Sequence, residues 1–349
     1  MTEPVSIALC GAGMIARAHA LAATSIGARV IAVASRTDET AHKFANEIGA
    51  RVVSYAQLPA GADVVVVATP PAAHFDHAAH ALERGAAVLL EKPLVTTLNE
   101  ADRLVDLADR HGNRILYAEN LAYAPITLAA IRTVASIAAK NDPLLHLEVR
   151  SVQSLPAWGN FTSPEWGGGA LFDLGVHPLA VAVVLARVAR AGEVVSVSAR
   201  LRGDATDTHA DVDLVFESGL VAKVVSSWEG SDVPSWDAQM SWANDVVRAE
   251  YFPTLNLEHN GETIALPRST SALPFISDLG YEAQLRSLID DVSSRATPFM
   301  DVRFGRWILE IVCAAYVSAA NDGQSTSVPS GCDRRRTPLD LWKNPPSTS

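Results

Sequence analysis

Short apolar runs alternate with helical segments along roughly the first 120 residues, and this alternation restricts the fold more than any other feature. The predicted strands are the runs at 5–10, 29–34, 63–67, 86–90 and 114–117. The predicted helices lie between them, at 14–26, 38–48, 70–84 and 99–111. The run Asp-Val-Val-Val-Val at 63–67 has the continuous apolar character of a strand covered on both faces. Strands and helices in this order predict an α/β fold with a doubly wound parallel sheet.

After about residue 120 the alternation gives way to a succession of strand-like runs. A helix is predicted at 126–138, and strands are predicted at 144–152, 194–201, 212–216, 221–228 and 239–242. These runs predict an α+β region with a large, mostly antiparallel open sheet that helices cover on one face. We expect the other face to be apolar and buried against a second subunit, in a homodimer or homotetramer. Two more helices are predicted at 281–293 and 303–319, and the tail from Ser325 is expected to be extended or loosely ordered.

Length, charge and cysteine spacing exclude several classes of protein. With 349 residues the chain is long enough for two domains, each with its own core. A net charge of −11 without a basic block argues against nucleic acid or an anionic membrane as partner. The chain shows neither a signal peptide nor an apolar run of membrane-spanning length, so we expect a cytoplasmic protein. Cys10, Cys313 and Cys332 lack metal-like spacing, so we expect incidental thiols and no bound metal.

The first predicted strand runs directly into Gly11-Ala12-Gly13-Met14-Ile15-Ala16, which opens the first predicted helix. A G-x-G-x-x-A pattern in this context is typical of a Rossmann dinucleotide site, and an ordinary strand-to-helix turn is the alternative. Gly11 suits the tight turn, Gly13 permits the approach of a pyrophosphate, and Ala16 allows close helix–strand packing. The N–H groups around Met14 and Ile15 would face the phosphates. We therefore predict a Rossmann dinucleotide-binding domain at 1–122 and a substrate-binding and oligomerisation domain at 123–349.

The end of the second predicted strand bears on the choice of cofactor. An NAD-selective site has Asp or Glu about 20 residues after the glycines, where it binds the ribose hydroxyls. This chain has Ser35-Arg36-Thr37 there, and Ser35 and Arg36 can donate hydrogen bonds to a 2′-phosphate. The sequence therefore favours NADP(H), with NAD(H) as the alternative. Asp38 competes for the role of ribose ligand but has the position of a helix cap, and an arginine can also stack on adenine in an NAD enzyme.

The carboxyl ends of the next two strands meet at the edge where the cofactor crosses the sheet. Thr69, Pro70 and His74 follow one strand, and Glu91-Lys92-Pro93 ends the other. Near a nicotinamide Lys92 suits acid–base chemistry, whereas Glu91 suits a structural role that fixes the loop or the lysine. A solvated helix position for His74 and a surface position for Lys92 are the alternatives. We also expect a cis peptide bond between Lys92 and Pro93, because only X–Pro bonds adopt this form at small cost.

A third stretch reads Trp166-Gly167-Gly168-Gly169-Ala170-Leu171-Phe172-Asp173-Leu174-Gly175-Val176-His177. Three successive glycines let the backbone approach a ligand with no side chain in the way. Asp173 and His177 lie four apart, which places both on one face if a helix starts there. A carboxylate beside an imidazole holds the tautomer of the ring and raises its basicity, as a proton-transfer site requires.

Four polar or aromatic residues are candidates for the substrate pocket. Asn120 and Tyr123 lie in an otherwise apolar passage after the sixth strand, although interdomain packing explains them nearly as well. Trp158 and Trp166 flank a loop rich in Gly, Ser and Pro and suit a wall on which a sugar ring stacks, although such aromatics are also ordinary interface residues. We expect Lys92, Asp173 and His177 to contact the substrate as well.

Together these residues resemble the glucose–fructose oxidoreductase / inositol dehydrogenase / MocA family along nearly the whole chain. The likeness rests on the loop at 11–16, on Glu91-Lys92-Pro93, on the stretch at 167–177, and on a C-terminal helix at 309–320 followed by Gly323 and Pro329. The resemblance implies an N-terminal Rossmann domain and a second domain whose open sheet mediates oligomerisation. It also implies that Lys92, Asp173 and His177 form the catalytic group, acting on a hydroxyl or carbonyl of a sugar, cyclitol or related polyol.

Two classes of function are compatible with these observations. The leading hypothesis is an NAD(P)-dependent oxidoreductase, in which Lys92 and His177 share proton transfer and Asp173 orients the imidazole. The alternative is a non-catalytic nucleotide-binding sensor on the same fold, which would be free to lose Lys92 or His177. Both residues are present, which favours the enzyme. Within the enzyme class, a dihydrodiol dehydrogenase and a sugar-nucleotide ketoreductase are the further alternatives.

Overall fold

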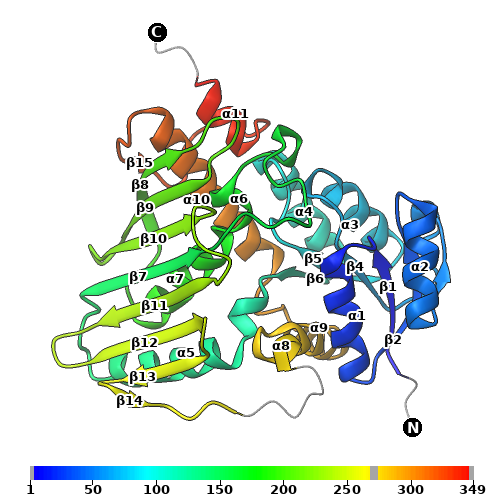
Figure 1. The fold of residues 1–349 in the computed structure, drawn as a ribbon, viewed down its shortest axis with the longest axis horizontal. Coiled ribbons are helices and arrows are strands. Elements are labelled where there is room, and N and C mark those ends of the chain that lie inside the picture. The colour runs from blue at the N-terminus through cyan, green and yellow to red at the C-terminus, as the bar shows by residue number, and fades with distance from the viewer. Residues whose placement is uncertain (1–3, 268–273, 346–349) are drawn as a thin grey trace. The chain divides into compact units, whose positions relative to one another are not determined.

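The computed structural model describes residues 4–267 and 274–345, which form two compact units (Figure 1). Among these residues, the first unit comprises 4–95, 99–124 and 274–306, and the second comprises 96–98, 125–267 and 307–345. The expected division at 122/123 lies close to the change of unit after Ala124. The segment 274–306 differs from that expectation, because it clusters with the first unit rather than with the remainder of the C-terminal half.

A six-stranded parallel sheet in the order β3-β2-β1-β4-β5-β6 forms the centre of the first unit. Its strands are β1 (Ser6–Cys10), β2 (Arg29–Ala34), β3 (Arg51–Val52), β4 (Val64–Val67), β5 (Ala87–Glu91) and β6 (Ile115–Ala118). The helices of this unit include α1 (Met14–Ser25), α2 (Asp38–Ile48), α3 (His74–Glu83), α4 (Leu98–Arg110), α8 (Pro274–Asp278) and α9 (Tyr281–Ser294). The predicted doubly wound parallel sheet is confirmed.

Continuous apolar sequence explains why these strands are central. Val64 to Val67 are buried at all four positions, so side chains on both faces of β4 are removed from water. Each such side chain contributes about 1.5–3 kcal/mol when fully buried. α1 packs with alanines, Ala16, Ala20 and Ala23 among them, and these small residues bring the helix close to the sheet. α9 lies against α1, β5 and β6, which is why the segment that contains it joins this unit.

The second unit contains a nine-stranded sheet in the order β14-β13-β12-β11-β7-β10-β9-β8-β15. Its strands are β7 (His146–Val152), β8 (Val194–Arg202), β9 (His209–Phe216), β10 (Val221–Ser227), β11 (Ser235–Ser241), β12 (Val246–Phe252), β13 (Asn256–His259), β14 (Glu262–Thr263) and β15 (Thr326–Ser327). Only the pair β7–β10 is parallel among the described pairings. α5 (Pro125–Ala138) and α7 (Val176–Val188) cover one face of the sheet (Figure 1), so the predicted open, mostly antiparallel sheet is confirmed.

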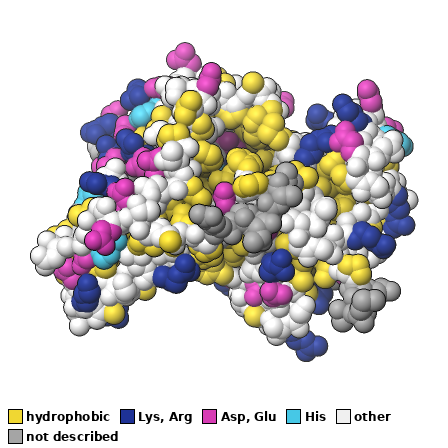
Figure 2. Space-filling model, turned by 60° about the horizontal axis from the view of Figure 1, so that its bottom comes forward, with side chains coloured by type: hydrophobic (Ala, Val, Ile, Leu, Met, Phe, Trp, Pro, Cys, Tyr) yellow, Lys and Arg dark blue, Asp and Glu magenta, His cyan; other side chains and the backbone are white. Residues whose placement is uncertain are grey.

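The uncovered face of this sheet is polar, and the expectation that it is apolar is wrong. Arg150 on β7 lies opposite Asp237 on β11 and donates to its carboxylate at 2.8 Å. Lys223 on β10 pairs with Asp211 on the neighbouring strand β9, with 3.8 Å between Nζ and Oδ1. Toward the left of Figure 2, basic and acidic side chains are interspersed. Along β7, β9 and β12, buried and mostly apolar side chains alternate with more exposed ones that include charged residues.

The described part of the C-terminal tail, residues 325–345, contains a short strand and a helix, so the expectation of an extended or loosely ordered tail is wrong for these elements. β15 pairs with β8, and α11 (Pro338–Lys343) buries Leu339 and Leu341. The hydroxyl of Thr337 caps α11 by accepting the N–H of Asp340 at 3.2 Å. α10 (Val302–Ala320) supplies buried Glu310, which accepts the N–H of Ser330 at 3.3 Å. β8 and Glu310 are distant from the tail in sequence, which is why composition alone did not predict these contacts.

Within the described residues, no single helix is long and apolar enough to cross a membrane. One bent pair, Pro164–Asp173 with Val176–Val188 at 43°, passes the test of length and composition together. Among the same residues, no group of three or more His, Cys, Asp or Glu side chains is placed to hold a metal ion. The peptide bond between Lys92 and Pro93 is cis, as predicted.

All three cysteines are free, and one of them has an unusually acidic thiol. A hydrogen bond from Cys313 lowers the pKa of Cys332 to about 7, whereas burial raises the pKa of Cys10. Thiolate is the nucleophile, so alkylation of Cys332 by iodoacetamide should rise with pH and reach half its maximal rate at about pH 7. Peptide mass spectrometry measures the rate. Cys313→Ala should move the midpoint upward, and a wild-type midpoint near pH 9 would contradict the assignment.

Candidate active site

Gly11 and Gly13 shape the turn between β1 and α1 in different ways. Gly11 has φ +119°, and a Cβ there would lie 2.5 Å from the carbonyl oxygen of Ala68, so only glycine fits. A Cβ on Gly13 would meet no described atom within 4 Å, so open space borders this position. The glycine pattern thus closes a tight turn at Gly11 and leaves room at Gly13.

The N-terminus of α1 fits an anionic ligand. Its N-cap is Gly13, which has no side chain to cap the helix, and Arg17 donates a backbone hydrogen bond of 3.2 Å to the Gly13 carbonyl. The N–H groups of Met14, Ile15 and Ala16 precede this hydrogen-bond ladder, as the first N–H groups of any helix do. Met14 is 51% exposed, which leaves the helix start accessible. A dinucleotide pyrophosphate therefore fits this cradle, where the helix dipole favours negative charge.

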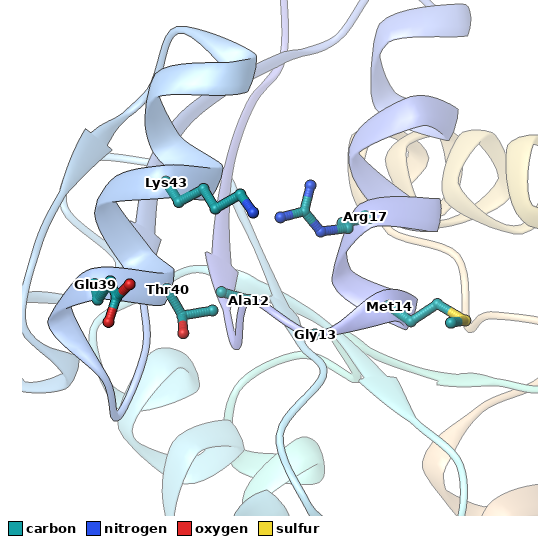
Figure 3. A pocket seen from close by; sticks show the side chains of 7 residues that line it. All are labelled: Ala12, Gly13, Met14, Arg17, Glu39, Thr40 and Lys43. Carbon is teal, nitrogen blue, oxygen red and sulfur yellow. The ribbon is translucent and has the colours of Figure 1, made fainter. Parts of the chain in front are cut away.

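A pocket of about 510 Å³ adjoins this helix start (Figure 3). Its lining residues are Ala12, Gly13, Met14 and Arg17 on the α1 side and Glu39, Thr40 and Lys43 on α2. The side chains of Arg17 and Lys43 point toward one another across the pocket. Arg17 also pairs with Glu47 and lies over the ring of Phe44 at 4.5 Å. Arg17, Thr40 and Lys43 could not be predicted from the sequence, because exposed polar positions on a helix give no signal of their own.

His74 connects the ends of β4 and β5. It is fully buried, with Nε2 at 2.8 Å from the carbonyl oxygen of Thr69 and Nδ1 at 2.9 Å from that of Pro93. Burial lowers the pKa of His74, although the carbonyl contacts oppose this shift. The alternative of a solvated helix position for His74 is wrong, and both ring nitrogens have backbone partners. Thr69 has a buried hydroxyl for which the described residues supply no partner, while Pro70 is exposed.

Glu91 holds the backbone of Lys92 at the end of β5. Its Oε2 accepts the N–H of Lys92 at 3.0 Å, and its Oε1 lies 2.6 Å from Nε2 of His19. Burial raises the pKa of Glu91, and the hydrogen bond and charge of His19 outweigh burial, so this pKa lies below its ordinary value. His19 is fully buried and meets the ring of Tyr281 edge-on at 5.3 Å. These bonds hold the backbone of Lys92 and agree with a structural role for Glu91.

In the second unit, Asp173 and His177 lie on two successive helices, the four-residue α6 (Ala170–Asp173) and the 13-residue α7, rather than on one. α6 ends before α7 begins, so the predicted common face of a single helix is wrong. The break lies at Gly175, where a Cβ would be 2.5 Å from the carbonyl oxygen of Leu171. Asp173 is 5% exposed and His177 is 7% exposed. Lys92 belongs to the first unit, and this pair belongs to the second.

The three glycines before α6 serve the chain's own conformation and packing. Gly167 has φ +96°, which glycine adopts readily. A Cβ on Gly168 would lie 2.3 Å from that of Phe172, and one on Gly169 would lie 2.1 Å from the carbonyl oxygen of Asp207. The glycines were expected to let the backbone approach a ligand. In the structure the backbone at Gly168 and Gly169 instead approaches Phe172 and Asp207 of the same chain.

Aromatic side chains gather around the loop that carries Trp158 and Trp166. Both rings contact Phe161 edge-on, at 4.6 Å and 5.0 Å, and Trp158 is 48% exposed. The ring of Trp236 on β11 lies 5.7 Å from that of His177. Trp236 could not be predicted from the sequence, because only strand pairing brings this distant residue to the imidazole.

Asn120 and Tyr123 have internal polar partners in the first unit. Nδ2 of Asn120 donates to the carbonyl oxygen of Leu279 at 2.8 Å. The hydroxyl of Tyr123 accepts the N–H of Met300 at 3.2 Å, and burial raises its pKa to about 12. These bonds support packing of the segment after β6 against the segment that contains α8 and α9.

Two family models match the chain. The oxidoreductase family with an NAD-binding Rossmann fold, GFO_IDH_MocA, matches residues 5–119, and the GFO/IDH/MocA C-terminal domain matches residues 143–236. Together these models cover more than half of the chain. The protein belongs to the GFO/IDH/MocA oxidoreductase family. The family assignment and the oxidoreductase activity expected from the sequence are confirmed.

Relatives of this oxidoreductase match it over most of their length. It is 26% identical to D-glucoside 3-dehydrogenase of Escherichia coli strain K12, over 91% of this chain and 96% of the relative. It is also 26% identical to D-xylose 1-dehydrogenase [NADP(+)] of Haloarcula marismortui, over 76% of this chain and 79% of the relative. The crystal structure of GenD2 from gentamicin A biosynthesis in complex with NAD has a TM-score of 0.82 and 26% identity, covering 94% and 97% of the two chains.

Alanine at two glycines of this oxidoreductase should separate binding from folding. Gly13→Ala meets no steric obstacle, so the free energy of unfolding should fall by at most about 1 kcal/mol. The added methyl lies where a pyrophosphate approaches, so the Kd for NAD(P)H should rise about tenfold. Gly169→Ala should instead lower the free energy of unfolding by about 2–3 kcal/mol, because its Cβ meets the backbone of Asp207. Denaturant unfolding and cofactor fluorescence measure the two effects, and equal destabilisation would contradict the geometry.

Proposed function

We propose that this oxidoreductase transfers hydride between a nicotinamide cofactor and a secondary carbon of a sugar, cyclitol or related polyol. The observation that carries the proposal is the open, uncapped start of α1 beside Gly13, where a dinucleotide pyrophosphate fits. The substrate class is supported by the relatives, whose names include D-glucoside 3-dehydrogenase and D-xylose 1-dehydrogenase. The test is absorbance at 340 nm with a panel of aldoses, glycosides, inositols and sugar nucleotides.

Three residues of the chain would carry out the proton chemistry in this proposal. When bound, the nicotinamide supplies or accepts the hydride. Lys92 would polarise the reacting oxygen, and its backbone is held by the buried carboxylate of Glu91. His177 would exchange the proton of the substrate hydroxyl, with Asp173 orienting the imidazole. The burial of Asp173 and His177 supports this assignment, because a catalytic carboxylate and imidazole act most strongly when water is excluded.

NADP(H) is the proposed cofactor, with NAD(H) as the alternative. Ser35 and Arg36 follow β2, where a ribose-binding carboxylate would repel a 2′-phosphate. Arg36 is exposed and therefore accessible to a ligand. A guanidinium binds phosphate through paired, charge-assisted hydrogen bonds. The named cofactors of the relatives differ, since the xylose dehydrogenase is named for NADP(+) and GenD2 was crystallised with NAD.

Arg36→Asp should reverse the cofactor preference. Loss of the cation and gain of a carboxylate should raise the Kd for NADPH about tenfold or more and leave the Kd for NADH equal or lower. Arg29→Asp is the matched control, because Arg29 is an exposed arginine at the opposite end of the same strand. Fluorescence titration measures both constants. Tighter binding of NADH than NADPH by the wild type would contradict the proposed preference.

Lys92→Met and His177→Ala should abolish turnover while leaving cofactor binding intact. General acid–base assistance is typically worth about 10²–10⁴-fold in rate, and neither side chain belongs to the glycine loop. Asp173→Asn should lower kcat less than His177→Ala, because an amide can still orient the imidazole. His146→Ala is the control, since His146 is an exposed histidine in β7. Near-normal kcat in both Lys92→Met and His177→Ala would remove the proposed catalytic group.

Self-association through the nine-stranded sheet is proposed as a homodimer or homotetramer. The uncovered face carries charges of both signs, including Arg150 and Asp237, and a two-fold partner could complement them. Sedimentation equilibrium at micromolar concentration and low salt should show a mass that is a multiple of the 37.1 kDa chain. A 37 kDa species alone would contradict the proposal.

A further inference from the structure

Asp207 binds three consecutive N–H groups at the start of α6. Its carboxylate accepts the N–H of Gly169 at 3.0 Å and that of Leu171 at 2.7 Å. Its backbone carbonyl accepts the N–H of Ala170, between them, at 2.8 Å. One fully buried residue thereby satisfies the first N–H groups of this helix, which have no partner within the helix itself.

Tyr316 of α10 completes this arrangement. Its hydroxyl donates to the carboxylate of Asp207 and accepts the N–H of Gly169 at 3.1 Å. Tyr316 is fully buried, and burial together with the neighbouring carboxylate raises its pKa well above the ordinary value. The phenol therefore stays protonated and keeps donating its hydrogen bond. Burial also raises the pKa of Asp207, against the opposing effect of these donors.

A tight turn brings Asp207 to this position. Gly203 follows β8 with φ +139°, and the N–H of Thr208 closes the turn on the carbonyl of Arg202 at 2.7 Å. Gly169 permits the contact from the other side, because its missing Cβ would lie 2.1 Å from the carbonyl oxygen of Asp207. The turn after β8 and the start of α6, which are distant in sequence, are thus in backbone contact at Asp207 and Gly169.

The backbone path from Gly169, which Asp207 and Tyr316 bind, to the Asp173/His177 pair is short. The carbonyl of Gly169 accepts the N–H of Asp173 at 2.9 Å, and that of Leu174 accepts the N–H of His177 at 3.2 Å. α6 has only four residues, and a helix of one turn is not stable without external contacts. Its orientation therefore depends on the groups that bind its first turn.

We propose that Asp207 and Tyr316 are positioning residues that hold α6 so that Asp173 and His177 keep their reactive orientation. This inference rests on the proposed function for the roles of Asp173 and His177. Misplacement of a reacting group by about 1 Å can cost on the order of 10²-fold in rate, so a displaced turn acts on kcat. The cofactor cradle at Gly13 belongs to the other unit, so cofactor affinity should not change.

Tyr316→Phe, Asp207→Asn and Asp207→Ala test the proposal. Tyr316→Phe should lower kcat by about 10- to 100-fold with unchanged Kd for NADPH. Asp207→Ala should lower it further, and Asp207→Asn should recover part of the loss, because the amide oxygen still accepts one N–H bond. Tyr251→Phe is the matched control, since the Tyr251 hydroxyl makes a buried bond of 2.9 Å to Thr127 in the same unit.

Two measurements on the substrate-free protein accompany the kinetics. Amide hydrogen exchange at residues 169–171 should accelerate in Tyr316→Phe and not in Tyr251→Phe. The ring resonance of His177, assigned with His177→Gln in protein labelled at histidine, should shift or broaden only in Tyr316→Phe. The proposal would be overturned if Tyr316→Phe and Tyr251→Phe lowered stability equally, while Tyr316→Phe kept the wild-type kcat and an unchanged His177 resonance.

These measurements also separate the inference from the proposed function. If the wild type oxidises or reduces none of the sugars and polyols, the proposed function fails. The exchange and resonance data still decide whether Asp207 and Tyr316 orient His177. If an Asp207 variant does not fold, Tyr316→Phe retains the carboxylate and decides the question alone.

Discussion

Backbone N–H groups at the first turn of a helix have no partner within the helix, and this chain meets that constraint in two opposite ways. At α1 the N-cap is a glycine with open space beside it, so the N–H groups are left to an anionic ligand. At α6 the carboxylate and carbonyl of Asp207 accept three successive N–H groups. One glycine-rich turn is thereby available for binding, and the other is held by the protein.

A second constraint is the buried carboxylate of Glu91. An unpaired buried charge destabilises a protein by several kcal/mol, so this group requires partners. His19 and the N–H of Lys92 supply them. The helix whose start fits the pyrophosphate therefore also holds the residue that precedes the proposed catalytic lysine. Packing of Tyr281 on His19 explains why α9, far away in sequence, belongs to the same unit.

Much of the fold could be predicted because its signals are local. The continuous valines of β4 and the glycines before α1 indicate a buried strand and a strand-to-helix turn within a few residues. The sequence analysis missed β12, although Val247, Ala249 and Tyr251 are buried alternately, because Arg248 and Glu250 interrupt its apolar character. α11 was not predicted either. Its cap at Thr337 and its buried Leu339 stabilise the helix only when other segments pack on it.

The sequence by itself determined where strands and helices alternate, where glycine is required at Gly11, and which residues are candidates for chemistry. Each of these depends on periodicity or on the conformational range of single residues. Only the tertiary structure decided that the glycines at 168 and 169 serve packing and that His74 is engaged through both ring nitrogens. It also decided that Asp207, Tyr316 and Trp236 lie near the Asp173/His177 region. Glycine pattern alone cannot distinguish a ligand from a buried carboxylate, because both bind the same unpaired N–H groups. Long-range pairing determines which of them occupies the turn.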